Sequence, residues 1–366
     1  MLLLAAAIGI SVCEAAPKRP LDAANNGKLR GAAVYAQVDE RGFGVQFVAQ
    51  DGSDLGAQLG VLGAVLVTTF DAGANAPRIE VASSRAARLS QSFNHERTAA
   101  QFGESLQAQL GQPPLLGAAL TIQALDEARK WEAGQFPEAA AVLAKVEYSL
   151  TQDLRSLEVV LTASAVSKDA VKIRKRGNRK GTPDEGIVYR NRLEYRSTPL
   201  ASHPEKPAQQ VDAEIEQIKE KYSQANLSKS RDRSRANMTT AEREAAIKKE
   251  TARARQYPPE FLAEYYMNMW LANDAELLRN ELQAGLAGVA ELLARDLQDA
   301  TVVDKSSRPD KSTVVTGDKR VVSRMNWLPF EGSLVSEPLD YTRPDSNAIA
   351  YAPQERAEAA TPADAQ

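Results

Sequence analysis

The chain is poor in the residues that most often carry out chemistry in enzymes. Its 366 residues include one cysteine and two histidines. Neither histidine belongs to an HxxxH or HExxH pattern, and no GxSxG motif accompanies them, so a zinc hydrolase and a Ser-His-Asp triad both lack their sequence signatures. GxGxxG and GxxxxGK[ST] patterns are also missing, which argues against a nucleotide site. We therefore expect no cofactor and no metal, and the sequence favours a protein that is not an enzyme.

The composition is otherwise that of an ordinary globular protein. Charged residues make up 25% of the chain and hydrophobic residues 43%, which is enough for a sizeable core. The net charge of −3 is too small to indicate a nucleic-acid partner. The protein could instead be a hydrolase that uses two carboxylates and needs neither a metal nor a cysteine. No motif, however, selects a catalytic pair among the 48 acidic residues.

The first residues have the features of an export signal. Residues 2–12 form an apolar run of signal-core length, and small residues follow it. Cleavage after Ala15 leaves a mature chain without cysteine, and therefore without disulfides. In the alternative, "ISVC" is a degenerate lipobox and Cys13 becomes a lipidated N-terminus. We expect a signal at 1–15, or ending before Cys13, then a mobile leader at 16–30, and export to the periplasm or to the periplasmic face of a bacterial membrane.

The most unusual stretch is "GSDLGAQLGVLGAVLVTTFDAGAN", residues 52–75. Its apolar part spans roughly 24 Å as a helix, which is short of the ~30 Å hydrocarbon core of a membrane. The spacing of the small residues gives a helix with one smooth face, against which another helix can pack closely. Over residues 52–72 the stretch resembles glycine-zipper segments of bacterial envelope proteins. We favour a helix buried within the fold, and a membrane-associated or self-associating helix is the alternative. The residues concerned are Gly52, Gly56, Gly60 and Gly63.

Alternating apolar residues in the middle of the chain predict a three-stranded antiparallel sheet. Its strands are "AVLAKVEYSLT", "SLEVVLTASAV" and "GIVYRNRLEYRS", with the first two joined through "QDLR". In the third strand, the buried face comprises Ile187, Tyr189, Leu193 and Tyr195, interrupted by Asn191, and the solvent face comprises Val188, Arg190, Arg192, Glu194 and Arg196. Two hairpins are also expected, one pairing 32–38 with 43–50 across "DERG" and one across "TGDK".

Helical patterns fill much of the remaining chain. Two helices broken near Asn94 are expected between residues 78 and 110, and Thr239 with Glu242 forms the capping-box pattern that opens another. A long apolar face predicts a helix over Asn273–Leu297, capped by Asn273 and packed on the sheet. The sequence therefore predicts an α+β fold with antiparallel β-hairpins and a central three-stranded sheet. We expect a single domain at 31–345 with a charged helical excursion at about 205–256, and a disordered tail at 352–366.

Two further segments are candidates for binding. A basic run on a hairpin loop can contact anionic lipid headgroups, lipopolysaccharide or nucleic acid, of which nucleic acid fits an exported protein least, and a solvated loop has the same composition. The aromatic group "YPPEFLAEYYMNMW" at 257–270 is typical of a core helix, and a ligand groove is the alternative. The expected partners are thus an envelope protein, an anionic surface or a second copy of the chain through the glycine-rich helix, and nucleic acid is not expected. The basic residues are Lys172, Arg174, Lys175, Arg176, Arg179 and Lys180.

Overall fold

The structure is a computed structural model. It describes residues 29, 31–48, 76–111, 122–124, 136–171, 173–176, 179–183, 186–200, 204–223, 237–298, 314–316, 319–324, 333–339 and 349–352. Contacts along the chain divide it into two compact units, each of which is described separately. The first unit comprises Met1–Pro199 with Trp270–Gln366, and the second comprises Leu200–Met269. The excursion expected at about 205–256 falls within the second unit.

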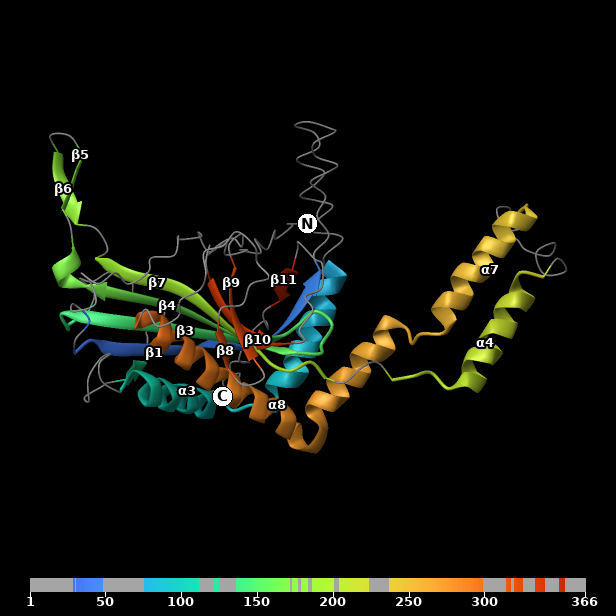
Figure 1. Ribbon diagram of the computed structural model, residues 1–366, viewed down its shortest axis with the longest axis horizontal. Coiled ribbons are helices and arrows are strands. Elements are labelled where there is room, and N and C mark those ends of the chain that lie inside the picture. The colour runs from blue at the N-terminus through green and yellow to red at the C-terminus, as the bar shows by residue number, and fades with distance from the viewer. Residues whose placement is uncertain are drawn as a thin grey trace, which may run out of the picture. The chain divides into compact units, whose positions relative to one another are not determined.

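The first unit is built on a mixed β-sheet (Figure 1). Within the described ranges the sheet has nine strands, eight of them in the order β11-β1-β3-β4-β7-β10-β9-β8, with β2 beside β1. Strands β5 and β6 form a separate two-stranded ribbon. The bounds are β1 Ala33–Val48, β2 Ile122–Ala124, β3 Ala140–Leu150, β4 Leu157–Ser167, β5 Ile173–Arg176, β6 Arg179–Pro183, β7 Ile187–Arg196, β8 Val314–Thr316, β9 Lys319–Arg324, β10 Ser333–Pro338 and β11 Ile349–Ala352.

The α+β class and the central three-stranded sheet are confirmed. β3 pairs antiparallel with β4, and β4 pairs antiparallel with β7. The loop that joins β3 to β4 is closed by the backbone bond from the N–H of Thr151 to the carbonyl of Ser156, at 2.8 Å. In this loop Leu154 has a positive φ of 59°, and its carbonyl accepts a hydrogen bond from the indole of the buried Trp270 at 2.7 Å. The hairpin expected across "TGDK" is also present, since Thr316 is the register partner of Lys319.

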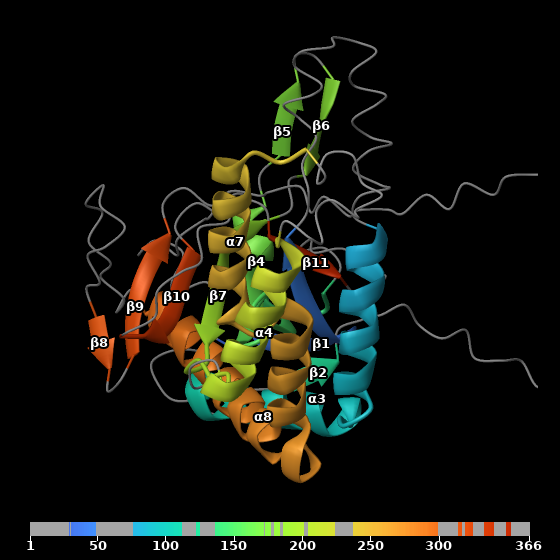
Figure 2. The ribbon, with the colours of Figure 1, turned by 90° about the vertical axis from the view of Figure 1, so that its right-hand side faces the viewer.

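Helices α3 and the C-terminal half of α8 lie on one side of this sheet (Figures 1 and 2). α3 (His95–Leu110) follows helical residues 76–90, and the break expected near Asn94 is confirmed because the Asn94 side chain accepts from the N–H of Arg97 at 2.9 Å. α8 (Pro259–Leu297) approaches the strands closely at two glycines. A methyl group on Gly285 would lie 2.5 Å from Cγ2 of Val159, and one on Gly288 would lie 2.5 Å from Cδ2 of Tyr195. The expected packing of this helix on the sheet is therefore confirmed.

The hairpin expected across "DERG" is wrong. Residues 33–48 form one long strand, β1, which runs parallel to β3 on both sides of these residues. The register is interrupted between Val38 and Phe43, so the four intervening residues form a bulge, and Gly42 there has a positive φ of 78°. A bulge uses the same turn-forming residues as a hairpin but lets the strand continue. The pairing of β1 with β3, which continues on both sides of these residues, makes the segment a bulge and not a hairpin turn.

A second bulge corrects the faces assigned to β7. The register between β4 and β7 shifts between Ala165 and Val166, so that Ile187 pairs with Val166. Ile187 consequently joins a buried apolar cluster with Tyr35, Leu143 and Val166. Tyr189, by contrast, reaches Asp296 on α8. The strict alternation of the sequence predicts that Ile187 and Tyr189 lie on the same face of the sheet. They do not, because one extra residue in the bulge reverses the alternation.

α8 contains a sharp kink rather than a new capped helix. Ala272 has an extended backbone, and the next three residues have left-handed φ values of 52°, 57° and 56°. These three are Asn273, Asp274 and Ala275. An N-cap residue has an extended backbone, so Asn273 does not have the cap conformation that the sequence predicts. Arg279 bonds to Asp274 at 2.9 Å across this segment.

The second unit is a helical hairpin followed by the first half of α8. α4 (Ala208–Lys221) and α7 (Thr240–Ala254) contact each other, and Lys221 pairs with Glu250 at 2.8 Å between them. The capping box at Thr239 and Glu242 is confirmed. The sequence spacing of Val211, Ile215, Ile218 and Tyr222 predicts an apolar stripe here. The first three are half-buried, and Tyr222, which follows the last residue of α4, is buried.

Candidate functional site: a basic ribbon and a buried row of charges

The basic run forms the β5–β6 ribbon, which is separate from the nine-stranded sheet (Figure 1). Arg174 is the register partner of Thr182, and Arg176 is the register partner of Arg179. The backbone thus places two arginines directly opposite each other next to the turn of the ribbon. Residues 173–183 contain five basic residues and no acidic residue. Like charges at directly opposite positions of a ladder are destabilising. The five basic residues are Arg174, Lys175, Arg176, Arg179 and Lys180.

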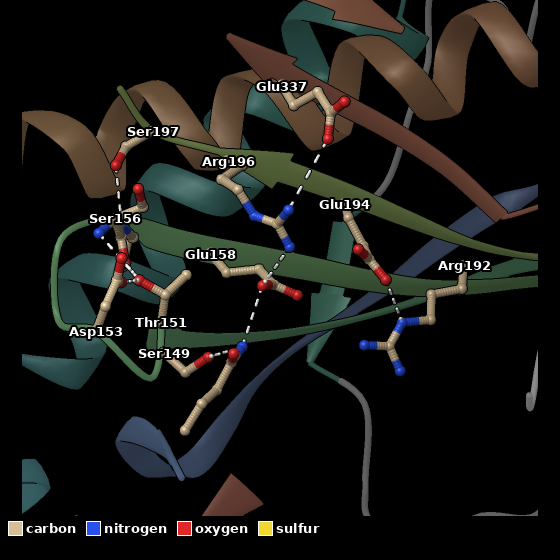
Figure 3. Close-up of polar contacts among 12 residues, drawn as sticks. Ser149, Thr151, Asp153, Ser156, Glu158, Arg192, Glu194, Arg196, Ser197 and Glu337 are labelled. Carbon is tan, nitrogen blue, oxygen red and sulfur yellow. Dashed lines mark hydrogen bonds and ion pairs between the residues drawn. The ribbon is translucent and has the colours of Figure 1, made fainter. Parts of the chain in front are cut away.

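The other candidate is a row of polar side chains that crosses five neighbouring strands of the sheet. Figure 3 shows four of its members, Ser149, Glu158, Arg196 and Glu337. Ser149 of β3 is opposite Glu158 of β4, and Glu158 is opposite Arg196 of β7. Glu337 of β10 is opposite Arg320 of β9. Directly opposite residues lie on the same face of a sheet, so these side chains form one line. We call Ser149, Glu158, Arg196, Glu337 and Arg320 the charged row.

Short contacts connect the members of the charged row. Arg196 Nη2 donates to Glu158 Oε2 at 2.8 Å, and Nη1 of the same guanidinium lies 3.8 Å from Glu337 Oε2. On the other side of Glu337, Arg320 Nε donates to Oε1 at 3.1 Å. Gln46 of β1 donates to both Ser149 and Glu158. The row therefore alternates in sign, with two carboxylates and two guanidinium groups.

Four members of the charged row are buried, although the sequence places one of them, Arg196, in solvent, and only Arg320 at its end is half-buried. Glu158 is 6% exposed, Arg196 4% and Glu337 7%. Glu194 of the same face is 1% exposed and bonds to Arg192 at 2.9 Å. The prediction that Glu194 and Arg196 face solvent is thus wrong. Burial opposes the charge of Arg192, but Glu194 and the neighbouring carboxylates hold its pKa above the ordinary value. Buried charges of this kind must be paired, because an isolated charge in the interior is very costly.

A smaller polar cluster lies on the face of the sheet that packs against α8. Asp296 of α8 accepts hydrogen bonds from the Tyr189 hydroxyl and from the Asn191 amide, both at 2.7 Å. Asn191, which interrupts the apolar pattern of β7 in the sequence, thus makes a polar contact with α8. Burial, followed by the nearby Asp296 carboxylate, raises the pKa of Tyr189 well above its ordinary value. A tyrosine that stays neutral in this way donates a hydrogen bond at all physiological pH values, which suits a structural role.

The remaining predicted positions lie outside the described residues. These are Gly52, Gly56, Gly60 and Gly63 of the glycine-rich stretch, Cys13, and Lys172 of the basic run. In the ranges that the structure describes, no helix has both the length and the apolar character of a membrane span. Over the same ranges, His, Cys, Asp and Glu residues form no group of three or more that could hold a metal ion.

Comparison with known proteins adds no assignment. No family model matches the chain, and neither a curated protein nor a solved structure does. Function must therefore be argued from the residues.

The sequence contained one usable signal for the charged row. Glu158 is the only charged residue in the run "SLEVVLTASAV". A lone acid in a strand that is otherwise apolar indicates a paired, buried charge. Its partner, Arg196, could not be chosen without the register of the strands.

Proposed function

We propose that this chain is an exported, non-catalytic protein of the bacterial envelope that binds an anionic surface at the periphery of a membrane. The observation that carries the proposal is the β5–β6 ribbon, in which Arg176 is opposite Arg179. Residues 173–183 contain five basic residues and no acid, so an anion beside them would relieve the repulsion between like charges. The N-terminal apolar run supports export, with Cys13 as the lipidated residue in the lipoprotein form.

The number of basic residues in contact with the membrane determines how strongly the protein should bind to anionic vesicles. Each lysine or arginine near an anionic membrane surface contributes about 1 kcal/mol, so replacing three should weaken binding by about 3 kcal/mol, or roughly a hundredfold. We expect the full chain to sediment with vesicles that contain anionic lipid but not with zwitterionic vesicles. Raising the salt concentration should release it, because salt screens exposed charges within about 10 Å at 0.1 M.

A matched pair of variants tests whether the ribbon is the contact. The first changes Arg174, Arg176 and Arg179 to glutamine. The second changes Lys248, Lys249 and Arg253 to glutamine, which removes the same charge from exposed positions on α7. Only the first variant should lose vesicle binding. Equal losses would mean that net charge alone governs binding, and an unchanged first variant would mean that the ribbon is not the contact.

Localisation is tested on the protein made in a bacterium. We expect fractionation of a C-terminally tagged chain to recover it from the periplasm, with an intact mass that begins at Ala16. Recovery from membranes with a diacylglyceryl mass on Cys13 would establish the lipoprotein form instead. Recovery from the cytoplasm with residues 1–15 intact would refute export.

A further inference from the structure

The second unit contains a groove at the base of its helical hairpin. It has a volume of about 390 Å³ and lies where the chain enters α4 and leaves α7. Pockets of 300–1,000 Å³ are typical of small-molecule sites, so the groove suits a ligand of one or two amino-acid residues. The lining residues used below are Pro204, Glu205, Lys206, Arg255, Tyr257 and Leu262.

A buried lysine fixes the shape of the groove. The side chain of Lys206 is 5% exposed, and its ammonium group donates to Glu214 Oε2 at 2.5 Å and to the carbonyl of Ala254 at 2.9 Å. Ala254 is the last residue of α7, so Lys206 ties the entering chain to the end of the helix. The ammonium group also lies 5.7 Å from the centre of the Tyr257 ring. These contacts hold the two sides of the groove together.

The apolar wall of the groove includes the ring of Tyr257, and Phe261, outside the lining, stacks on that ring. The rings of Tyr257 and Phe261 stack with their centres 4.0 Å apart and an angle of 17° between their planes. Phe261 is 44% exposed, although the sequence favours a core role for this aromatic group. Leu262 and Pro204 add further apolar surface. A ring or an aliphatic side chain of a ligand could pack against this wall.

The charge at the mouth comes from Arg255. This residue is exposed at the C-terminal end of α7, and its guanidinium makes no ion pair or hydrogen bond with any residue in the part of the chain that the structure describes. Lys206 is already paired with Glu214, which leaves Arg255 as the group on the lining that is ready to bind an anion. A guanidinium binds a carboxylate through two parallel hydrogen bonds. Glu205, also on the lining, can accept an N–H of the ligand.

We propose that this groove binds an α-carboxylate that is attached to an apolar side chain. Arg255 holds the carboxylate, Glu205 accepts the neighbouring N–H, and the side chain packs on Tyr257 and Leu262. A free apolar amino acid and the C-terminal residue of a peptide both supply this chemistry. The site does not depend on the β5–β6 ribbon, so failure of one proposal leaves the other intact.

The first experiment compares N-acetylphenylalanine with its uncharged amide, N-acetylphenylalaninamide, by NMR titration of the full chain. We expect the acid to bind at least about tenfold more tightly, because charge-assisted hydrogen bonds are stronger than neutral ones. Free phenylalanine separates the two sources: tighter binding than the N-acetyl acid assigns a free amino acid, and weaker binding assigns a peptide C-terminus. If acid and amide bind equally, or neither binds, the proposal is overturned.

Two variants and one control locate the contact. Arg255→Gln should remove the preference for acid over amide, whereas Arg253→Gln, on the same turn of α7 but not on the lining, should preserve it. Leu262→Trp should fill the groove and abolish binding of both probes, while the helical circular dichroism stays unchanged. Equal effects of Arg255→Gln and Arg253→Gln would show general charge attraction and refute the assignment to this groove.

Discussion

The strongest stability prediction concerns the centre of the charged row. Changing Arg196 to methionine removes the guanidinium between Glu158 and Glu337 but keeps a side chain of similar length. The two carboxylates are 6% and 7% exposed, so neither can be rehydrated without opening the structure. Breaking a buried ion pair on one side costs about 3–5 kcal/mol, because the remaining charge is left without compensation. Gln46, which still donates to Glu158 at 3.1 Å, should keep the loss near the lower end of that range.

Urea unfolding followed by tryptophan fluorescence measures this loss. All three tryptophans belong to the first unit, so the signal reports the unit that contains the row. The control is Arg279→Met, which breaks an ion pair whose carboxylate partner, Asp274, is 87% exposed and should cost less than about 1 kcal/mol. The double change of Arg196→Met with Glu158→Gln should recover part of the loss, because the remaining carboxylate, Glu337, still pairs with Arg320 at 3.1 Å. If Arg196→Met costs no more than Arg279→Met, the burial argument is wrong.

Two further predictions concern α8 and the sheet beneath it. Gly288→Ala should destabilise the first unit by about 1–3 kcal/mol through its clash with Tyr195, although alanine is the better helix former, whereas Ala287→Gly on the exposed side should cost only about 1 kcal/mol. Chemical unfolding of both variants checks this, and a stabilised Gly288→Ala protein would contradict the close approach. The raised pKa of Tyr189 contributes stability below pH 10 that is lost as the pH rises further, because the unfolded chain then releases a proton that the folded chain keeps. Relative to Tyr189→Phe, the wild-type free energy of unfolding should fall by about 1.4 kcal/mol more per pH unit above pH 10, and parallel pH profiles would refute this.

Local patterns predicted the parts of the fold that depend on neighbouring residues. The alternation in β3, β4 and β7, the turn after Thr316, and the caps at Asn94 and Thr239 are all set by a few consecutive side chains. A few consecutive residues are therefore enough to determine each of these features. The predictions succeeded for that reason.

The errors have a common physical origin in contacts between distant residues. The "DERG" segment has turn composition, but pairing of β1 with β3 on both of its sides makes it a bulge. Arg196 and Glu194 alternate with apolar residues as solvent-facing charges do, yet both are buried. The partner Glu337 comes from a strand more than one hundred residues later in the chain, and only the register brings the charges together. The Lys206 contact with Ala254 is hidden from sequence reasoning in the same way.

The charged row also accounts for the register in which β10 pairs with β7. The register between β7 and β10 is parallel and consists of three residue pairs, from Leu334 opposite Leu193 to Ser336 opposite Tyr195. A pairing of only three residue pairs specifies the register weakly. A slip by one residue would turn Glu337 to the other face of the sheet, where Tyr195 packs against α8. The ion pairs of Glu337 with Arg196 and Arg320 form only in the observed register, so the cost of burying these charges selects one arrangement of β9 and β10 against its neighbours.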